Sequence, residues 1–161
     1  MIDENSSSED SFVFYRILGN DLPPLHSPQQ TLHNLRFILD YEPQVHNLEK
    51  RWIVNRIADP EMEAQVIELL RGRSQHFIRV GFDLDEYRTL QPDYSHFTEQ
   101  DFADFIDKAS TREYTKLLDH TLHRKNQYVM NLNNARNLAL RDGRSRARWI
   151  LPWDGNCFLS E

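Results

Sequence analysis

The tripeptide Asp154-Gly155-Asn156 closely follows an apolar run that ends at Leu151. In an extended or turning chain, the Asp154 carboxylate and the Asn156 amide, two positions apart, project to one side. Hard oxygen ligands of this kind suit Mg²⁺ or Mn²⁺, with phosphate oxygens and water completing the coordination. Asp-Gly-Asn is also ordinary turn sequence. The spacing alone therefore leaves a divalent-cation site and a plain turn open as alternatives.

A second candidate site is the pentapeptide Asn133-Asn134-Ala135-Arg136-Asn137, which we expect at the start of a helix. Free backbone N–H groups and the helix dipole attract anions at such a position. Arg136 adds a planar guanidinium that fits a phosphate or the edge of a base. Helix capping by Asn133 or Asn134, together with a surface arginine, explains the same residues equally well.

Two further polar loops follow apolar runs, Gly19-Asn20-Asp21 and the segment from Asn55 to Asp59. An amide or carboxylate held at the end of a strand can bind the polar edge of a nucleobase or a ribose. Asp59 is also the expected N-cap of the helix that follows it. A binding role and a capping role are both open for this residue.

The other reactive residue types give weaker indications. His120 and His123 are three apart, which is more typical of a polar surface than of a metal site. One cysteine, Cys157, excludes an internal disulfide and a multi-cysteine zinc site, and a buried structural thiol is its expected role. The sequence holds no HExxH, GxGxxG, GxxxxGK[ST] or GxSxG motif.

Regular elements must position these residues. Four apolar runs predict β-strands over residues 12–18, 51–57, 76–80 and 148–151. One helix is expected after a capping box of Ser27 and Gln30, with Pro28 at its first position, and another after the Asp59 cap. A third helix is expected to start at Asn133 or Asn134 and to end at Gly143.

Strands that alternate with helices predict an α/β fold with a Rossmann-like, mainly parallel sheet flanked by helices. Residues 83–126 interrupt the alternation and predict a helical insertion in two pieces, the first opening at Thr98. Ligands in such folds bind beyond the carboxyl ends of the strands, at a switch point in the strand order. The polar loops described above each follow a predicted strand and are therefore expected to meet.

The chain of 161 residues has the size of one domain, and its formal net charge of −6 argues against general nucleic-acid binding. The charge is uneven, with ten acidic and four basic residues in 81–120 but one acidic and seven basic residues in 124–148. A local positive patch in an acidic protein suits a small anionic ligand such as a nucleoside diphosphate. A solvated helix end explains the same arginines.

The chain carries no sign of a targeting or membrane segment. No stretch approaches the roughly 18 consecutive apolar residues of a transmembrane helix. Residues 1–10 are an acidic, Ser-rich leader, expected to be disordered, without the basic and apolar regions of a secretory signal. We therefore expect no transmembrane segment and a cytoplasmic protein.

The order of these segments along the chain and their residue types resemble the N-terminal half of a GT-A fold glycosyltransferase. The resemblance is greatest to the inverting family 2. Leu18-Gly19-Asn20-Asp21 resembles the first nucleotide-contacting loop of that family. Asn55 and Asp59 resemble the end of its second strand, with Asn55 where the family usually has Asp. The helix segment from Asn134 to Ala139 is close to the family's Ala-Arg-Asn signature, and Asp154-Gly155-Asn156 stands in the position of its Asp-x-Asp motif.

The resemblance covers about residues 12–160 apart from the insertion, and implies a GT-A-like nucleotide-sugar-binding domain over 11–161. It implies a nucleoside diphosphate sugar as donor, an unknown acceptor, and Mn²⁺ or Mg²⁺ at Asp154 and Asn156. The neutral Asn156 departs from the family and should weaken the metal site. The family's catalytic base, which follows the Asp-x-Asp strand, has no counterpart before Glu161, so a C-terminally truncated domain is expected.

Within this resemblance the nucleotide-binding residues are Leu18, Gly19, Asn20, Asn55, Asp59, Asn134 and Arg136. Two other functions stay open. A non-catalytic protein-interaction module would use the acidic, aromatic segment 83–126 as its binding surface. A nucleotidyltransferase shares the sheet plan, but usually has a Gly-rich, basic loop after its first strand, whereas the loop from Gly19 to Pro24 contains no Lys or Arg.

Overall fold

The computed structural model describes residues 10–22, 26–95, 98, 100, 103, 105 and 110–160. Its strands are β1 (Phe12–Leu18), β2 (Leu48–Asn55), β3 (Phe77–Val80) and β4 (Trp149–Asp154). Its helices are α1 (Gln30–Tyr41), α2 (Pro60–Gly72), α3 (Leu84–Thr89), α5 (Thr111–Thr121), α6 (His123–Met130) and α7 (Leu132–Gly143). The expected leader lies outside the described residues except for Asp10, as does most of the helical piece expected after Thr98.

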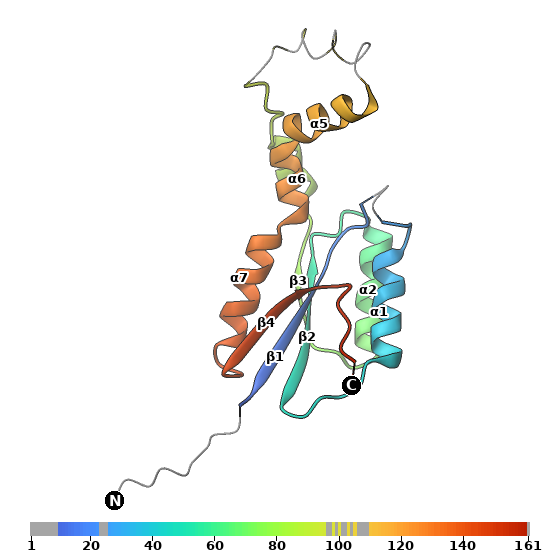
Figure 1. Ribbon diagram of the computed structural model, residues 1–161, viewed down its shortest axis with the longest axis vertical. Coiled ribbons are helices and arrows are strands. Elements are labelled where there is room, and N and C mark those ends of the chain that lie inside the picture. Colours follow the sequence, from blue (N-terminus) through green and yellow to red (C-terminus); the bar gives the residue numbers. More distant parts are fainter. Residues whose placement is uncertain are drawn as a thin grey trace, which may run out of the picture.

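The four strands form one parallel sheet in the order β3-β2-β1-β4 (Figure 1). The prediction of an α/β, Rossmann-like sheet flanked by helices is confirmed. The chain moves outward from β1 through β2 to β3, then returns through the helical region and places β4 on the other side of β1. The switch in strand order therefore lies between β1 and β4.

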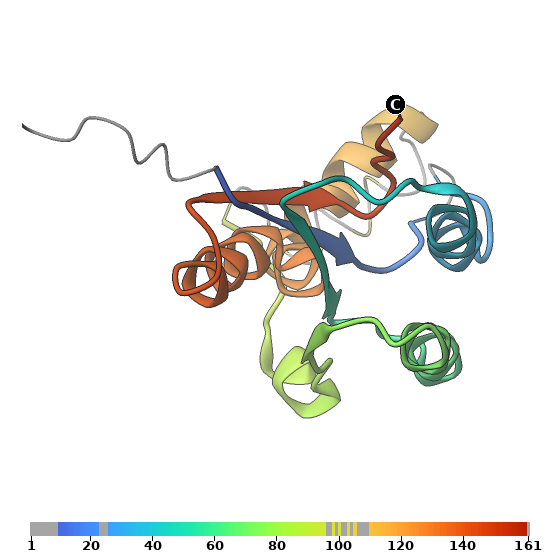
Figure 2. The same cartoon turned by 90° about the horizontal axis from the view of Figure 1, so that it is seen from below.

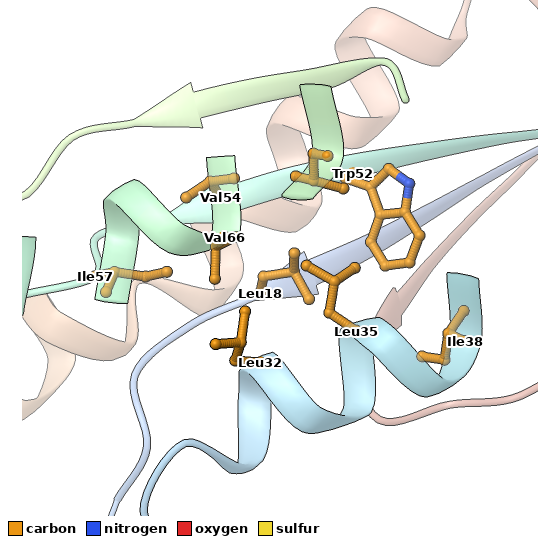
Figure 3. Packing of buried hydrophobic residues seen from close by; sticks show 9 residues of the cluster. Leu18, Leu32, Leu35, Ile38, Trp52, Val54, Ile57 and Val66 are labelled. Carbon is orange, nitrogen blue, oxygen red and sulfur yellow. The ribbon is translucent and has the colours of Figure 1, made fainter. Parts of the chain in front are cut away.

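Helices cover both faces of the sheet, with α1 and α2 on one side and α7 on the other (Figure 2). Side chains alternate between the two faces of a strand, so a strand covered on both faces is apolar almost throughout. In β1, Leu18 packs with Trp52 and Val54 of β2 under α1 and α2 (Figure 3). Val13, Tyr15 and Ile17 face α7 instead, where they meet Ala135 and Ala139.

Several predicted boundaries are corrected. β2 begins at Leu48 and ends at Asn55, because Arg56 takes a left-handed backbone conformation with φ 46° that breaks the strand. Ile57, predicted as strand, is buried in the loop that follows. β4 runs on to Asp154 instead of ending at Leu151.

The start of α1 differs from the predicted capping box. The Ser27 amide donates to the Gln30 side chain as expected, but the helix begins at Gln30, after Pro28 and a left-handed Gln29. Asp21 provides the cap instead, because its carboxylate accepts hydrogen bonds from the Thr31 amide and the Thr31 hydroxyl at 2.9 and 2.8 Å. The loop after β1 is thereby fixed to α1.

The insertion stands beyond the carboxyl end of the sheet (Figure 1). At its base, the rings of Phe82, Tyr87 and Tyr128 pack on one another, and the Arg56 guanidinium lies 3.7 Å from the centre of the Tyr128 ring. Helix α6 runs into α7 with only Asn131 between them. No helix in the described part of the chain is long and apolar enough to cross a membrane.

Asp142 fastens the C-terminal end of α7 to the sheet. Its carboxylate accepts a hydrogen bond from the Tyr15 hydroxyl and another from Arg146, and lies 3.2 Å from Nε of Arg51. Burial favours the protonated acid, but these partners together hold the pKa of Asp142 below its usual value of 3.8. The ionised carboxylate is therefore the form that the fold stabilises.

This lowered pKa predicts a pH dependence of stability. As pH falls, the unfolded chain protonates Asp142 before the folded chain does, so stability is complete above the unfolded pKa and is lost as pH drops through the folded value. As pH is lowered from about 6 to 3, the melting temperature of Asp142→Asn should fall less steeply than that of the parent. Asp85→Asn, whose side chain is 94% exposed, is the control and should follow the parent. The prediction would be contradicted if the melting temperatures of the parent and of Asp142→Asn fell equally with pH.

Candidate functional site

A cavity of about 220 Å³ lies at the carboxyl ends of β1, β2 and β4, beside the switch in strand order. Six of the residues predicted for nucleotide or metal binding line it: Leu18, Gly19, Asn20, Asn55, Asp154 and Asn156. These residues come from three segments far apart in the sequence. The parallel sheet brings them together because every strand ends at the same edge.

Asn20 joins the loop after β1 to the loop after β2. Its amide nitrogen donates to the backbone carbonyl of Arg56 at 2.7 Å, and its side-chain oxygen accepts from the Ala58 amide at 2.7 Å. Both ends of the side chain are thus engaged within the protein. Asn20 therefore holds the loop after β1 against the loop after β2, beside the cavity that it lines.

Asn55 is buried, with 2% of its surface exposed. Its amide nitrogen donates to the backbone carbonyl of Met130 at 2.8 Å, and its oxygen accepts from the Asn131 side chain at 2.8 Å. The sequence interpretation of Asn55 as a residue that binds a base edge does not anticipate these contacts. Asn55 links β2 to the junction of α6 and α7 and so fixes one wall of the cavity.

Asp59 lies outside this cavity and caps α2, accepting from the backbone amides of Glu61 and Met62. It lines a second hollow, together with Asn20 and Asp21, between the starts of α1 and α2. The capping role expected for Asp59 is confirmed. The acidic residues around this hollow make it a poor surface for a phosphate.

Asn134 and Arg136 do not line the cavity either. The predicted capping by Asn133 or Asn134 is wrong, because α7 begins at Leu132 after a left-handed Asn131, which places Asn134 inside the first turn with its side chain exposed. Arg136 lies two residues after Asn134 on the same helix. Its Nη2 atom is 3.5 Å from the Asp154 carboxylate, which does line the cavity.

The tripeptide Asp154-Gly155-Asn156 begins at the last residue of β4 and forms a turn, in which the Cys157 amide donates to the Asp154 carbonyl at 3.2 Å. Gly155 lies against β1, and a Cβ at this position would stand 2.7 Å from the Ile17 carbonyl oxygen. Glycine is therefore required by a close approach of two backbones. Cys157 is partly exposed, which corrects the expectation of a buried thiol.

These residues fit a protein-held Mn²⁺ or Mg²⁺ ion poorly. Asp154 already pairs with a guanidinium, and Asn156 contributes no charge. Within the part of the chain that the structure describes, no three His, Cys, Asp or Glu side chains gather around one point. One paired carboxylate and one amide give a weaker donor set than such cations usually take.

The cavity wall includes residues that the sequence interpretation missed. The segment before α1 and the first turns of that helix contribute His26, Gln30, Thr31 and Asn34. Thr31 and Asn34 are three apart and share one face of the helix. This spacing is visible in the sequence, but only the packing of Leu32 and Leu35 against the sheet turns that face toward the strand ends.

The turn at Gly155 supports a prediction about stability. Gly155→Ala should lower the free energy of unfolding by about 1–3 kcal/mol, since the added methyl meets backbone that cannot move freely. Gly72→Ala is the matched control, because a Cβ there meets nothing within 4 Å and alanine favours the helix. Urea denaturation of the two variants gives the comparison. A similar free energy for both would contradict the close approach at Gly155.

No protein-family model, curated protein or solved structure matches the chain.

Proposed function

We propose that the chain binds a nucleoside diphosphate sugar at the cavity beside β1 and β4, as the donor-binding part of a glycosyltransferase. The observation that carries the proposal is the meeting of three separated polar loops around one cavity at the switch in strand order. Ligands of doubly wound folds bind at this place. The resemblance of the loops to those of family 2 glycosyltransferases names the ligand class.

The chemistry of the cavity suits the parts of such a donor. The Asn34 amide on one wall offers a donor and an acceptor for a base or a ribose, and the Gln30 amide nitrogen beside it offers a further donor. Leu18 and Met130 supply apolar surface for the flat base. Arg136, at the Asp154 side of the cavity, is the cation for the diphosphate.

In glycosyl transfer an acceptor hydroxyl attacks the anomeric carbon with the help of a general base, and negative charge grows on the departing diphosphate. The residues of this chain act on the donor side of that reaction. The cavity walls orient the nucleoside, and the Arg136 guanidinium stabilises the charge on the diphosphate.

Calorimetry with UDP, GDP and ADP tests the proposal. We expect one of the three to bind with a Kd in the millimolar range or below, and more tightly than its nucleoside. Absence of binding by all three at millimolar concentration would contradict the proposal. That outcome would favour the interaction module at 83–126.

One aromatic residue of the segment 83–126 is not available for such an interaction surface. Tyr87, one of the aromatic residues that would form the interaction surface, packs against Phe82 and Tyr128 at the base of the insertion. Lys125 also lies over the Tyr87 ring, at 4.8 Å from its centre. This side chain is therefore engaged within the protein instead of being presented to a partner.

A further inference from the structure

We infer that Arg136 and Asp154 form an exchangeable ion pair, in which the diphosphate takes the place of Asp154 on the guanidinium and binds without a divalent cation. The inference rests on the proposed function, because it concerns the same cavity and the same ligand. It departs from the metal site that the Asp-Gly-Asn sequence predicts. Its basis is the geometry of the pair, its exposure and the charges around it.

The ion pair is loose and accessible. Nη2 of Arg136 lies 3.5 Å from Oδ1 of Asp154, and the two side chains are 43% and 58% exposed. Arg79 and Glu63, by contrast, make two hydrogen bonds of 2.9 Å in the paired arrangement that guanidinium and carboxylate prefer. A single long contact between exposed charges stabilises a fold little and is easily replaced by a better partner.

The position of the pair connects it to the cavity. Asp154 lines the cavity, so the guanidinium that reaches it stands at the same rim. Leu132, at the start of the same helix, also lines the cavity, which places Arg136 one turn from the wall. A diphosphate seated against this rim would lie on the side of the cavity where Asp154 contacts Arg136.

The charges explain why exchange is favoured. An unpaired Asp154 carboxylate would repel a diphosphate, and Asn156 brings no charge to hold a cation between them. Arg136 pairs with Asp154 when the cavity is empty. When a diphosphate fills the cavity, Arg136 forms an ion pair with the ligand instead. A phosphate presents more charge and more acceptor oxygens to the guanidinium than one carboxylate does.

The two accounts of Asp154 make opposite predictions for one variant. If Asp154 held a metal, Asp154→Asn would weaken nucleotide binding and remove its dependence on the cation. If Asp154 competes for Arg136, Asp154→Asn frees the guanidinium and should tighten UDP binding about two- to fivefold. Arg136→Ala should weaken binding about tenfold or more, and Arg136→Lys less, because lysine keeps the charge but loses the planar fork.

The experiment titrates UDP and, separately, inorganic pyrophosphate into the parent, Asp154→Asn, Arg136→Ala and Arg136→Lys, once with EDTA and once with excess Mg²⁺ or Mn²⁺. Arg141→Ala is the matched control, an exposed arginine on the same helix whose loss changes the net charge equally. Its affinity should match that of the parent. Thermal melts of every variant report whether the fold is intact.

Binding in EDTA that the cations change by less than about twofold, with tighter binding by Asp154→Asn, is the expected result. Binding that requires the cation and is lost in Asp154→Asn would overturn this inference and leave the proposed function standing. Weakening by Arg141→Ala equal to that by Arg136→Ala would also overturn it, since only overall charge would then matter. Absence of UDP binding by every protein in both conditions would overturn the inference and the proposed function together.

Discussion

Replacing Glu42 by alanine is expected to lower the free energy of unfolding by about 3–5 kcal/mol. The side chains of Arg16 and Glu42 form an ion pair and are 0% and 1% exposed. Lys50 also contacts the Glu42 carboxylate, at 2.8 Å. Burial lowers the pKa of Arg16, and the negative charge of Glu42 opposes that change. Without Glu42, two cations lose their counter-charge in a water-poor site.

The same carboxylate holds the end of the described chain. Glu42 accepts a hydrogen bond from the Leu159 amide at 2.8 Å, and Nε of Arg16 donates to the Cys157 carbonyl at 3.0 Å. These contacts fasten the segment that follows Asn156 to the sheet face beside α1. Glu42→Ala should therefore loosen the turn at Asp154 as well as the core.

Chemical denaturation of Glu42→Ala and of Asp40→Ala provides the comparison. Asp40, near the end of α1, pairs with Arg73 at the end of α2, but these side chains are 42% and 49% exposed. A pair of this exposure contributes about 1 kcal/mol or less. Glu42→Gln keeps the size of the side chain, and its free energy of unfolding should lie between those of the two alanine variants. If Glu42→Ala and Asp40→Ala lost the same free energy of unfolding, the buried charges around Glu42 would not be what stabilises this part of the fold.

Asn34→Trp is expected to weaken nucleoside diphosphate binding at least about a hundredfold. Asn34 is half-buried and lines the cavity from α1. An indole at this position takes up space that the ligand needs. His33→Trp is the matched control, since the neighbouring side chain on the same helix is exposed and does not line the cavity.

Calorimetric titration and thermal melts of both tryptophan variants check this prediction. His33→Trp should keep the affinity of the parent, and both variants should melt close to the parent temperature. An unchanged affinity of Asn34→Trp would show that the ligand binds elsewhere. Equal weakening in both variants would point to α1 as a whole, not to the cavity.

The fold follows from local features of the sequence that the structure preserves. Apolar runs separated by polar turns predict the strands, and Asp59 before Pro60 predicts the start of α2 through side-chain capping. The order of strands and helices then predicts a parallel sheet with its polar loops at one edge. The meeting of Gly19, Asn55 and Asp154 around one cavity depends on this topology, not on any one motif.

What could not be predicted depends on contacts between distant segments. Arg16 lies in a run that predicts a buried strand, and nothing in its neighbourhood identifies Glu42, 26 positions away, as its partner. The amides of Asn20 and Asn55 have the type expected of ligand-binding residues. Their contacts with Arg56 and Met130 exist only once the loops have come together.

The start of α7 shows a different limit. Three asparagines, Asn131, Asn133 and Asn134, stand close together and each can begin a helix. The structure uses Asn131, whose left-handed backbone joins α7 to α6 and whose side chain contacts Asn55. Asn55 lies 76 positions earlier in the sequence, so local capping preferences do not reveal this contact.

The central claim is that a nucleoside diphosphate binds beside β1 and β4, and the most direct test is a two-dimensional ¹H–¹⁵N NMR titration of the parent chain with UDP. We expect the backbone amide signals of Gly19, Asn20, Gly155 and Asn156 to shift together and to saturate. Signals of α5, beyond the carboxyl end of the sheet, should stay in place. Saturable shifts confined to α5 and α6, or no shifts at millimolar UDP, would contradict the account.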